Sequence, residues 1–336
     1  MLRKQMRCSL GVLLIVASGT GHSQAPNPQE VELAQSCRHD TATKIPIRGV
    51  KGSRQNPCFI SSTGNLLAFT NFTTRYNIGH AIVRTVSVKG GKTLRTLSPT
   101  TSQSVNLPGI DGCWSPSNSL VTYTSDVIDR DEVYTVPATG GTPKRITNRP
   151  GYLAFEPSFS PILSDGSQWI VFESHKESKP DCCGELWKVR LDNHRLVRLT
   201  HGSDDRQPEW SPNGDKIVFQ RQVSPGNWDV FTIDTNGGSL FNVTNNPSAG
   251  NTDCSWSPSG NYIVYSAGGP HINVANLLII AATGGTPIQL TNSCGLDGAP
   301  GWSPDGSRIA FESAPFDPDK KGSTAIWIIN APLGIK

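Results

Sequence analysis

The sequence predicts an all-β fold in which a unit of four antiparallel strands recurs around a ring, and three repeated landmarks support this expectation. The first landmark is an aromatic residue followed by a serine and a tight turn. It occurs six times, the first copy being degenerate: Phe59-Ile60-Ser61, Trp114-Ser115-Pro116, Phe159-Ser160-Pro161, Trp210-Ser211-Pro212, Trp256-Ser257-Pro258 and Trp302-Ser303-Pro304. The aromatic positions are 55, 45, 51, 46 and 46 residues apart (59→114→159→210→256→302). A repeat of this length is typical of the blades of a β-propeller.

The other two landmarks recur in the same phase as the first. A pair of glycines marks a second turn at Gly90-Gly91, Gly140-Gly141, Gly237-Gly238 and Gly284-Gly285. An aliphatic residue followed by threonine ends the unit at Ile146-Thr147, Leu199-Thr200, Val243-Thr244 and Leu290-Thr291. Because three independent patterns agree, we interpret the chain as a six-bladed β-propeller.

One copy shows how its residues specify each strand. The strands expected within it are 207–211, 216–220, 229–234 and 240–244. Pro212-Asn213-Gly214 makes the first turn, because proline presets φ and Asn-Gly accepts a positive φ. The second and third strands are rich in β-branched and aromatic residues, and the third alternates with period two. Gly237-Gly238 then supplies the hairpin into the fourth strand.

The last copy lacks an outer strand. Its third strand, 325–329, is followed only by 330–336, whereas 43–48 precedes the first copy and belongs to no repeat. We expect this N-terminal segment to supply the missing outer strand, which closes the ring and removes an exposed edge. The expected organisation is a signal peptide at 1–25, a short N-terminal segment at 26–41 and a six-bladed propeller of four-stranded antiparallel blades at 42–336.

The repeated phrases also resemble those of a known family. The turn Trp302-Ser303-Pro304-Asp305-Gly306, the strand after it and the glycine pair with its Leu-Thr ending resemble the WD-like repeats of TolB-type six-bladed propellers. The resemblance covers nearly all of the chain that follows the expected signal peptide. Such propellers serve as the binding domain of the Tol envelope protein, as the substrate-gating domain of prolyl-oligopeptidase-like peptidases, or as scaffolds of unknown role. The resemblance therefore implies a fold but leaves the activity open.

The N-terminal residues predict export. Arg3, Lys4 and Arg7 precede the apolar run 10–17, and small residues allow cleavage after Ala25. We therefore expect a periplasmic or secreted protein, with an uncleaved anchor as the alternative. No other run is long and apolar enough to cross a bilayer, so no integral membrane segment is expected in the mature chain. A net charge of +3 without a basic run gives little support to nucleic-acid binding.

Seven cysteines follow the expected signal peptide, which agrees with an oxidising compartment. We expect a disulfide between Cys254 and Cys294. Cys254 lies two residues before Trp256, and Cys294 lies in the loop that leaves the same blade. Both positions fall at the same end of the blade, where their Cα atoms could come within bonding distance.

Other cysteine pairings are less favoured by the sequence. Cys58 and Cys113 occupy equivalent places in neighbouring blades and are expected to be too far apart. A bond between the vicinal Cys182 and Cys183 would be strained. Zinc binding is the alternative for the cysteines, but no CxxC pair exists and the histidines are scattered.

Motifs for catalysis are scarce. The sequence has neither a G-x-S-x-G elbow nor an H-E-x-x-H pair, so we assign no catalytic, cofactor-binding or metal-binding residue and expect no cofactor. The acidic residues Asp126, Asp129, Asp131 and Glu132 lack the spacing of an EF-hand. We expect them to form a solvated loop, with calcium binding as the alternative.

Three polar residues mark the start of the innermost strands. Asp205 and Asp297 lie five residues before their repeat tryptophans, and Asn251 occupies the matching place. In a closed ring these positions converge near the mouth of the central channel, where they could form a site for a cation or ligand. The alternative is that each side chain caps its own inter-blade turn.

Propeller geometry places the second-to-third-strand loops and the inter-blade loops on one face, which we call the loop-rich face. The opposite face carries mostly tight turns. Variable loops on a rigid scaffold are where binding usually occurs. Six larger side chains in these loops are candidates for partner contact: Tyr76, His80, His175, Trp228, His271 and Phe316. Each could instead pack beneath its own loop.

Two classes of function remain open. The first is an exported, monomeric scaffold that binds a protein or glycan through the loop-rich face. The alternative is an enzyme that uses the central channel, such as a polysaccharide lyase or a hydrolase. The lack of a recognisable nucleophile or metal-ligand set favours binding.

Overall fold

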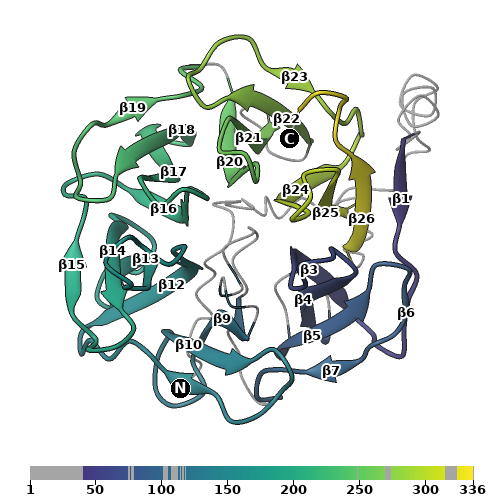
Figure 1. Cartoon of the computed structure of the whole chain (residues 1–336), viewed down its shortest axis with the longest axis horizontal. Helices are drawn as coiled ribbons and strands as arrows, with labels where there is room; N and C mark the ends of the chain where they lie inside the picture. Colours follow the sequence, from purple (N-terminus) through teal and green to yellow (C-terminus); the bar gives the residue numbers. More distant parts are fainter. Residues whose placement is uncertain are drawn as a thin grey trace, which may run out of the picture.

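The computed structural model of the chain describes residues 41–74, 76, 79–100, 105–106, 113, 115, 117, 119–247, 249–268, 274–314 and 324–335. Its regular elements are β-strands arranged as a ring of blades (Figure 1). The expected all-β propeller is therefore confirmed. Within the described ranges, no helix has the length and apolar character that a membrane crossing requires. The expected signal peptide lies outside these ranges.

Four of the sheets are separate units of four strands each. The first blade consists of β3 (Ser53–Phe59), β4 (Leu66–Phe72), β5 (Ala81–Ser87) and β7 (Arg95–Thr96). The second consists of β8 (Val105–Asn106), β9 (Leu120–Ser125), β10 (Glu132–Pro137) and β11 (Lys144–Arg145). The third consists of β12 (Tyr152–Phe159), β13 (Trp169–Lys176), β14 (Glu185–Arg190) and β15 (Leu196–Arg198). The fourth consists of β16 (Asp205–Trp210), β17 (Lys216–Ser224), β18 (Asn227–Asp234) and β19 (Phe241–Asn242).

A further sheet of eight strands divides into two units, which are joined only by the parallel pair Ala275 and Leu296. The fifth blade consists of β20 (Gly250–Trp256), β21 (Tyr262–Gly268), β22 (Ala275–Ala281) and β23 (Ile288–Gln289). The sixth consists of β24 (Leu296–Trp302), β25 (Arg308–Ala314), β26 (Ala325–Asn330) and β1 (Ala42–Lys44). The described strands thus group into six four-stranded units, the number that the repeats predict.

The N-terminal segment closes the ring, as expected. Strand β1 runs antiparallel to β26, with Ala42 opposite Ile329. A second contact follows, because β2 (Ile47–Arg48) pairs in parallel with β6 (Gly91–Lys92) of the first blade. Gly90 has a φ of 79°, and a Cβ atom there would lie 2.6 Å from a ring carbon of Pro46, so the turn fits only a glycine. One short segment therefore fastens the last blade to the first.

The repeat aromatics pack at the interfaces between blades. Five of them are at most 4% exposed: Phe59, Phe159, Trp210, Trp256 and Trp302. Each lies against the blade that precedes it in the ring, as Trp210 does against Trp169 and Leu186 of the third blade. Large aromatic side chains bury roughly 150–250 Å² each, so these contacts supply much of the packing between blades. Trp114 lies outside the described residues.

The repeated threonine has a structural role of its own. In four blades its Oγ1 accepts a hydrogen bond of 2.9–3.0 Å from a backbone N–H near the start of the third strand. The donor and acceptor pairs are Val133 and Thr147, Leu186 and Thr200, Val230 and Thr244, and Leu277 and Thr291. The hydrogen bond of the threonine thereby fixes the end of the short fourth strand to the third strand, beyond the last backbone pair between them.

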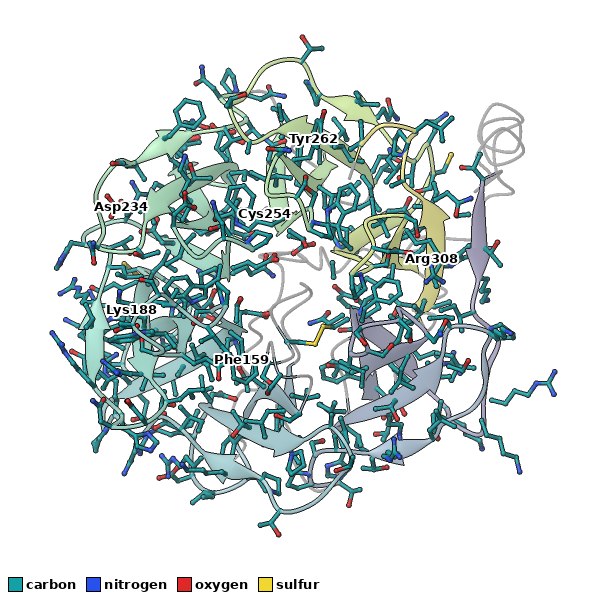
Figure 2. The ribbon with its side chains drawn as sticks, viewed as in Figure 1. Phe159, Lys188, Asp234, Cys254, Tyr262 and Arg308 are labelled. Carbon is teal, nitrogen blue, oxygen red and sulfur yellow. A yellow bond between two sulfur atoms is a disulfide. The ribbon has the colours of Figure 1, made fainter. Side chains whose placement is uncertain are left out.

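The expected Cys254–Cys294 disulfide is wrong. Cys254 is a free thiol, fully buried against Val218 and Val230 of the preceding blade. Cys294 is disulfide-bonded, and therefore not to Cys254. Figure 2 shows Cys254 and Phe159 in the inner half of the ring, whereas Asp234 lies near the rim. The inner strands are the place where neighbouring blades approach most closely.

This convergence also explains the cysteine pair that the sequence did not predict. Cys58 and Cys113 form a disulfide between the first two blades, with their Cα atoms 6.5 Å apart. Each lies one residue before its repeat aromatic, and both are fully buried. Equivalent residues on the inner ends of neighbouring blades are therefore close enough to bond, because the ring narrows toward its axis. Cys182 and Cys183 form a second disulfide.

Candidate functional site

Six residues on the second strands occupy equivalent places, because each pairs with the same position of its third strand. They are Thr70, Thr124, Glu173, Gln220, Ser266 and Glu312, opposite Val83, Val133, Leu186, Val230, Leu277 and Ile326. The sequence varies at this position more than at the apolar positions around it. Each blade therefore has one position, close to the inner strand, at which the fold accepts different polar side chains.

The inner strands carry a second set of equivalent residues at β-bulges. The register shifts in β3, β12, β16, β20 and β24. At each bulge a residue other than glycine has a positive φ: Asn56 (51°), Glu156 (48°), Gln207 (51°), Asp253 (52°) and Ala299 (47°). Each lies three residues before its repeat aromatic. A left-handed conformation is unfavourable for such residues and persists only where neighbouring contacts hold it.

The two sets hold each other across the blade interfaces. The bulge N–H of Asn56 donates to Oε2 of Glu312 at 2.9 Å, which joins the first blade to the sixth. The N–H of Gln207 donates to Oε2 of Glu173 at 2.8 Å, which joins the fourth blade to the third. The N–H of Asp253 donates in the same way to the side chain of Gln220 at 3.0 Å. Each of these three bulges thus presents its backbone N–H to a side chain of the preceding blade.

This arrangement gathers four carboxyl groups near the axis, which we call the axial carboxylate cluster: Glu156, Glu173, Asp253 and Glu312. All four are at most 3% exposed, and they come from three different blades. Figure 2 shows side-chain oxygens at the inner ends of the blades, around the centre of the ring. Among the described residues, no group of three or more His, Cys, Asp or Glu side chains is arranged to hold a metal ion.

The charges in the axial carboxylate cluster act on one another. Burial, followed by the charges of Glu173, Asp253 and Glu312, holds the pKa of Glu156 well above its usual range. Burial raises the pKa of Glu312 to about 8, although the hydrogen bond from Asn56 opposes the shift. Burial also raises the pKa of Asp253. The cluster therefore favours protons, or another source of positive charge, at neutral pH.

Tyr76 is one of two partner-contact candidates that the structure brings to this cluster. It lies in the loop between β4 and β5, and its phenol donates to Oε1 of Glu312 at 3.3 Å. Burial and the charge of Glu312 raise the pKa of Tyr76 well above its usual value, so the phenol remains a donor. The side chain is half-buried, which leaves part of it at the loop-rich face. Tyr76 thus links this loop to Glu312 of the cluster.

His175 lies beneath its loop rather than on the surface. It is fully buried, with Nε2 3.1 Å from Oε1 of Glu173 and Nδ1 3.3 Å from the carbonyl oxygen of Cys182. Its ring meets Phe155 edge-on. His175 therefore connects a surface loop to the axial carboxylate cluster.

The other expected contact residues are not brought together. His80 is exposed; its carbonyl oxygen accepts a hydrogen bond from the Thr73 N–H, and its own N–H donates to the Thr73 hydroxyl. Trp228 is buried, with the Arg206 guanidinium 5.2 Å from its ring centre. His271 and Phe316 lie outside the described residues.

The three expected channel-mouth residues are each engaged locally. Asp205 is fully buried and forms a two-point ion pair with Arg221 of its own blade, at 2.6 and 2.9 Å. The Asn251 amide donates to Asp229 of the preceding blade at 3.0 Å. Asp297 is fully buried, and its carbonyl oxygen accepts a hydrogen bond from Ser266. The Asp205 and Asn251 side chains are thus engaged with neighbouring side chains, whereas this contact of Asp297 is made by its backbone, and the channel-mouth site and the turn caps both remain predictions.

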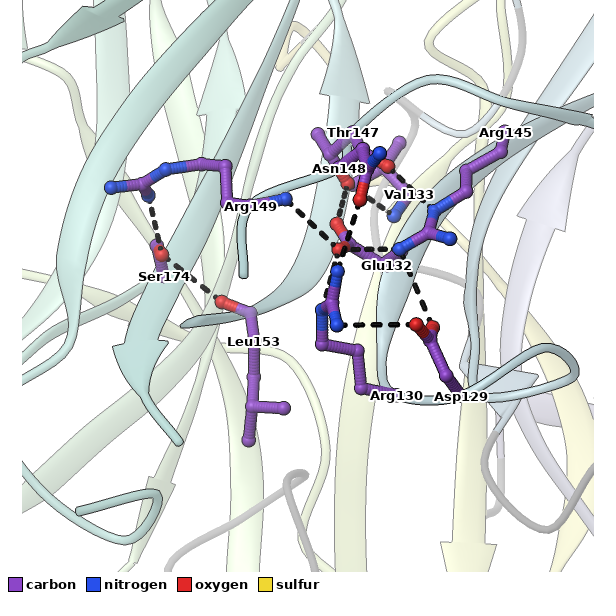
Figure 3. A network of polar contacts seen from close by, with 10 residues as sticks. All are labelled: Asp129, Arg130, Glu132, Val133, Arg145, Thr147, Asn148, Arg149, Leu153 and Ser174. Carbon is purple, nitrogen blue, oxygen red and sulfur yellow. Dashed lines mark hydrogen bonds and ion pairs between the residues drawn. The ribbon is translucent and has the colours of Figure 1, made fainter. Parts of the chain in front are cut away.

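The acidic residues near 130 include one that is not solvated, contrary to expectation. Glu132 is fully buried and accepts hydrogen bonds from Arg130, Arg145, the Thr147 hydroxyl and the N–H of Arg149 (Figure 3). The network joins the third strand of the second blade to the turn that enters the third blade. It borders a cavity of about 350 Å³ near the rim, partly lined by Arg145 and Thr147. Glu132 is therefore occupied in holding this interface together.

Sequence reasoning missed the axial carboxylate cluster, although two signals for it exist. Polar residues recur three positions before the repeat aromatic, where a buried inner strand should be apolar. The tripeptide Phe-Glu-Ser also recurs at 172–174 and 311–313, which places a glutamate inside an otherwise apolar second strand in two copies. A buried glutamate in a repeated strand position indicates a shared site more directly than a loop residue does.

Comparison with known proteins supports the fold at several levels. Residues 59–271 match the family model described as TolB beta propeller domain. An uncharacterised protein of Agrobacterium fabrum is 29% identical over 194 residues, which cover 53% of this chain and 63% of that protein. The match therefore spans less than two thirds of the relative's length.

Solved structures with low sequence identity share the same fold. TolB from Acinetobacter baumannii is 18% identical with a TM-score of 0.61, over 81% of this chain and 65% of that chain. An oligogalacturonate lyase from Vibrio parahaemolyticus is 12% identical with a TM-score of 0.51, over 88% of this chain and 93% of that chain. At such identities these similarities concern the fold alone.

Proposed function

The chain belongs to the TolB beta propeller domain family, and from this premise we propose that it is an exported, monomeric scaffold that binds a protein partner through the loop-rich face. A cationic side chain of the partner would be received above the axial carboxylate cluster. The division into a signal peptide (1–25), a short segment (26–41) and the propeller (42–336) is part of this proposal.

The observation that carries the proposal is the axial carboxylate cluster beneath Tyr76. Carboxyl groups from three blades are buried together, and burial raises the pKa of Glu156, Glu312 and Asp253, with neighbouring carboxylates adding to the rise at Glu156 and Glu312. A lysine or arginine side chain of a partner would reverse this effect, because an opposite charge nearby favours the carboxylate form. Guanidinium and ammonium groups also form strong, directional hydrogen bonds with carboxylates. A neutral glycan would gain none of this charge stabilisation, which favours a protein partner.

Export is supported by two further observations. The chain begins with a basic stretch, an apolar run and small residues that suit a secretory signal. Disulfides link Cys58 to Cys113 and Cys182 to Cys183, and such bonds persist in oxidising compartments. The proposed location is accordingly the periplasm or the exterior.

The test is capture of the native partner by the purified protein, compared between variants. Glu312→Gln and Glu156→Gln should reduce partner capture about tenfold or more, because each removes a charge that a buried cation would pair with. Asp192→Asn removes an exposed carboxylate in the turn between β14 and β15, on the face opposite to the loop-rich face, and should leave capture unchanged. Undiminished capture by both cluster variants would contradict the proposal.

A channel enzyme is the second candidate, and one observation favours it. A pKa of about 8 keeps Glu312 protonated at neutral pH beside other carboxyl groups, which is the condition of a general acid. The fold is shared with a protein described as an oligogalacturonate lyase. Turnover of an acidic or neutral oligosaccharide that disappears in Glu312→Gln, while the melting temperature is kept, would establish this candidate in place of the scaffold.

A further inference from the structure

The loop between β13 and β14 carries an exposed disulfide between adjacent residues. Cys182 and Cys183 are bonded, and both are exposed at the loop-rich face. The Cys58–Cys113 disulfide differs from it in accessibility, because both of its cysteines are fully buried. A thiol reagent in solution therefore meets the vicinal pair without any opening of the fold.

The backbone on both sides of this pair is held in place. The Asp181 carbonyl accepts a hydrogen bond from Arg206 at 2.9 Å, and the Gly184 N–H donates to Asp204 at 2.9 Å. Between these anchors, Cys183 has a φ of 63°, a left-handed conformation that side chains other than glycine adopt rarely. The left-handed conformation of Cys183 is unfavourable, and the Cys182–Cys183 bond restrains it. When this bond is opened, relaxation of Cys183 favours a rearrangement of the loop between its two anchored ends.

A chain of contacts leads from this loop to the axial carboxylate cluster. The carbonyl oxygen of Cys182 lies 3.3 Å from Nδ1 of His175, whose Nε2 lies 3.1 Å from Oε1 of Glu173. The other oxygen of Glu173 accepts the bulge N–H of Gln207 in the fourth blade at 2.8 Å. His175 and Glu173 are both buried, so these contacts have no competing solvent. A shift of the Cys182 carbonyl is thereby transmitted inward.

We propose that Cys182 and Cys183 form a thiol–disulfide exchange site that takes dithiols, and that its opening alters the His175–Glu173 contact at the axis. A thiolate of the dithiol attacks one sulfur of the pair and forms a mixed disulfide, while the other cysteine leaves as a thiolate and gains a proton. The second thiol of the reductant then closes its own disulfide and releases the remaining cysteine. The protein disulfide is reduced by two electrons and two protons, and the dithiol is oxidised by the same amount.

Opening the disulfide changes the contact between the loop and His175. Without the bond between the two sulfur atoms, Cys183 can leave its left-handed conformation while Asp181 and Gly184 stay anchored. The peptide group between Cys182 and Cys183 must rotate in that change, and the Cys182 carbonyl rotates with it. His175 then loses its contact with the loop, and its ring, no longer held at Nδ1, shifts against Glu173.

The first test measures which cysteines open. The full chain is incubated with increasing dithiothreitol, blocked with N-ethylmaleimide, digested and analysed by mass spectrometry. Cys182 and Cys183 should be labelled together at about tenfold less reductant than Cys58 and Cys113 require, because exchange depends on access. Labelling of Cys182 and Cys183 without any reductant, or labelling of Cys58 and Cys113 first, would overturn the exchange site.

The second test follows the imidazole rings by NMR of histidine-labelled protein. Reduction should shift the His175 ring signals, and a Cys182→Ser/Cys183→Ser variant should show the shifted position without reductant. His194, whose Nδ1 contacts the Ile146 carbonyl at 3.0 Å in another part of the fold, is the internal control and should not move. Unchanged His175 signals in a sample whose vicinal thiols are fully labelled would refute the connection to the axis.

Discussion

The phenol oxygen of Tyr76 lies 3.3 Å from Oε1 of Glu312, so a loop of the first blade meets a strand of the sixth. The same glutamate accepts the bulge N–H of Asn56 through its other oxygen at 2.9 Å. Glu312 is therefore shared between the closure of the ring and the site on its axis. Its ionisation should affect both stability and binding.

The stability of the protein should fall as pH rises toward 9. Burial raises the pKa of Glu312 from its usual 4.5 to about 8, so folding favours its protonated form. This contribution is fully present below pH 4.5 and is lost as pH rises through about 8. Glu312→Gln cannot ionise and should be more stable than the wild type at pH 8.5, by up to about 4–5 kcal/mol, since a pKa change of one corresponds to about 1.4 kcal/mol.

Urea unfolding at pH 5 and at pH 8.5 measures this difference. The two proteins should differ little at pH 5, where the wild-type carboxyl is already neutral. Glu177→Gln, at an exposed carboxylate, should reproduce the wild-type pH dependence. Parallel pH profiles for the wild type and Glu312→Gln would show that Glu312 ionises normally.

Tyr76→Phe should weaken partner binding more than it weakens the fold. The change removes one donor to Glu312 and leaves the ring in place, which costs about 0.5–1.5 kcal/mol for a single hydrogen bond. If the proposed function holds, affinity for the captured partner should fall about three- to tenfold, because the hydroxyl lies beside the cluster. Calorimetric titration and a melting curve on the same sample separate the two effects. A melting temperature that collapses would show that Tyr76 is chiefly structural.

Truncation of a repeat tryptophan should be among the most damaging single changes. Trp210→Ala or Trp256→Ala leaves a large cavity at a blade interface and should lower stability by about 3–5 kcal/mol. Leu240→Ala, at a side chain that is 48% exposed, should change stability by less than about 0.5 kcal/mol. Denaturant midpoints are the measurement, and similar values for all three variants would contradict the packing role.

Disruption of the first strand should open the ring. Deletion of 42–50 removes both β1 and β2 and leaves β26 with an unpaired edge, so we expect aggregation or loss of cooperative unfolding. A finer pair is Thr43→Pro against Thr43→Ala, since only proline removes a backbone donor opposite Ile328. Light scattering and melting curves report the outcome, and a monomeric deletion variant with an unchanged transition would place the closure elsewhere.

Loss of the inner disulfide should also be costly. The Cys58→Ala/Cys113→Ala variant removes a bond between residues 55 positions apart and should lose about 2–4 kcal/mol. Cys254→Ala removes a buried thiol but no bond, so it should cost less. Peptide mapping without reductant should find Cys58 linked to Cys113 and Cys254 free. Any bonded form of Cys254 would contradict the structure.

The fold could be predicted from the sequence because the residues that recur in every copy are those that pack between blades. Trp210 and Trp302 recur since every blade interface needs a large apolar side chain at the same point, and the closing strand at 42–44 follows from the unpaired last copy. The repeat predicts that equivalent residues make equivalent contacts in every blade. This prediction holds for the residues that face a neighbouring blade.

The site could not be predicted in the same way, because it depends on distances across the axis. Cys58 and Cys113 were expected to be far apart, yet the inner strands converge and bring them to 6.5 Å between Cα atoms. Asp205, a candidate for a site at the channel mouth, pairs with Arg221 on the adjacent strand, a contact that the sequence did not indicate. Glu312 was overlooked since it lies in an apolar strand, and its burial is explained by the hydrogen bonds to its two oxygens from the bulge N–H of Asn56 and the phenol of Tyr76.

The pairing of Ala42 with Ile329 has a consequence for the order of events during folding. The two strands are far apart in the sequence, so β1 cannot pair until β26 has been synthesised. Joining distant segments is entropically slow, and it comes last when the intermediate blades assemble from local contacts. The protein therefore passes through a late stage in which five units are formed and β26 still offers a free edge. Factors that shield exposed strands would act on this stage, and mutations in 42–44 should lower yield by slowing the final step.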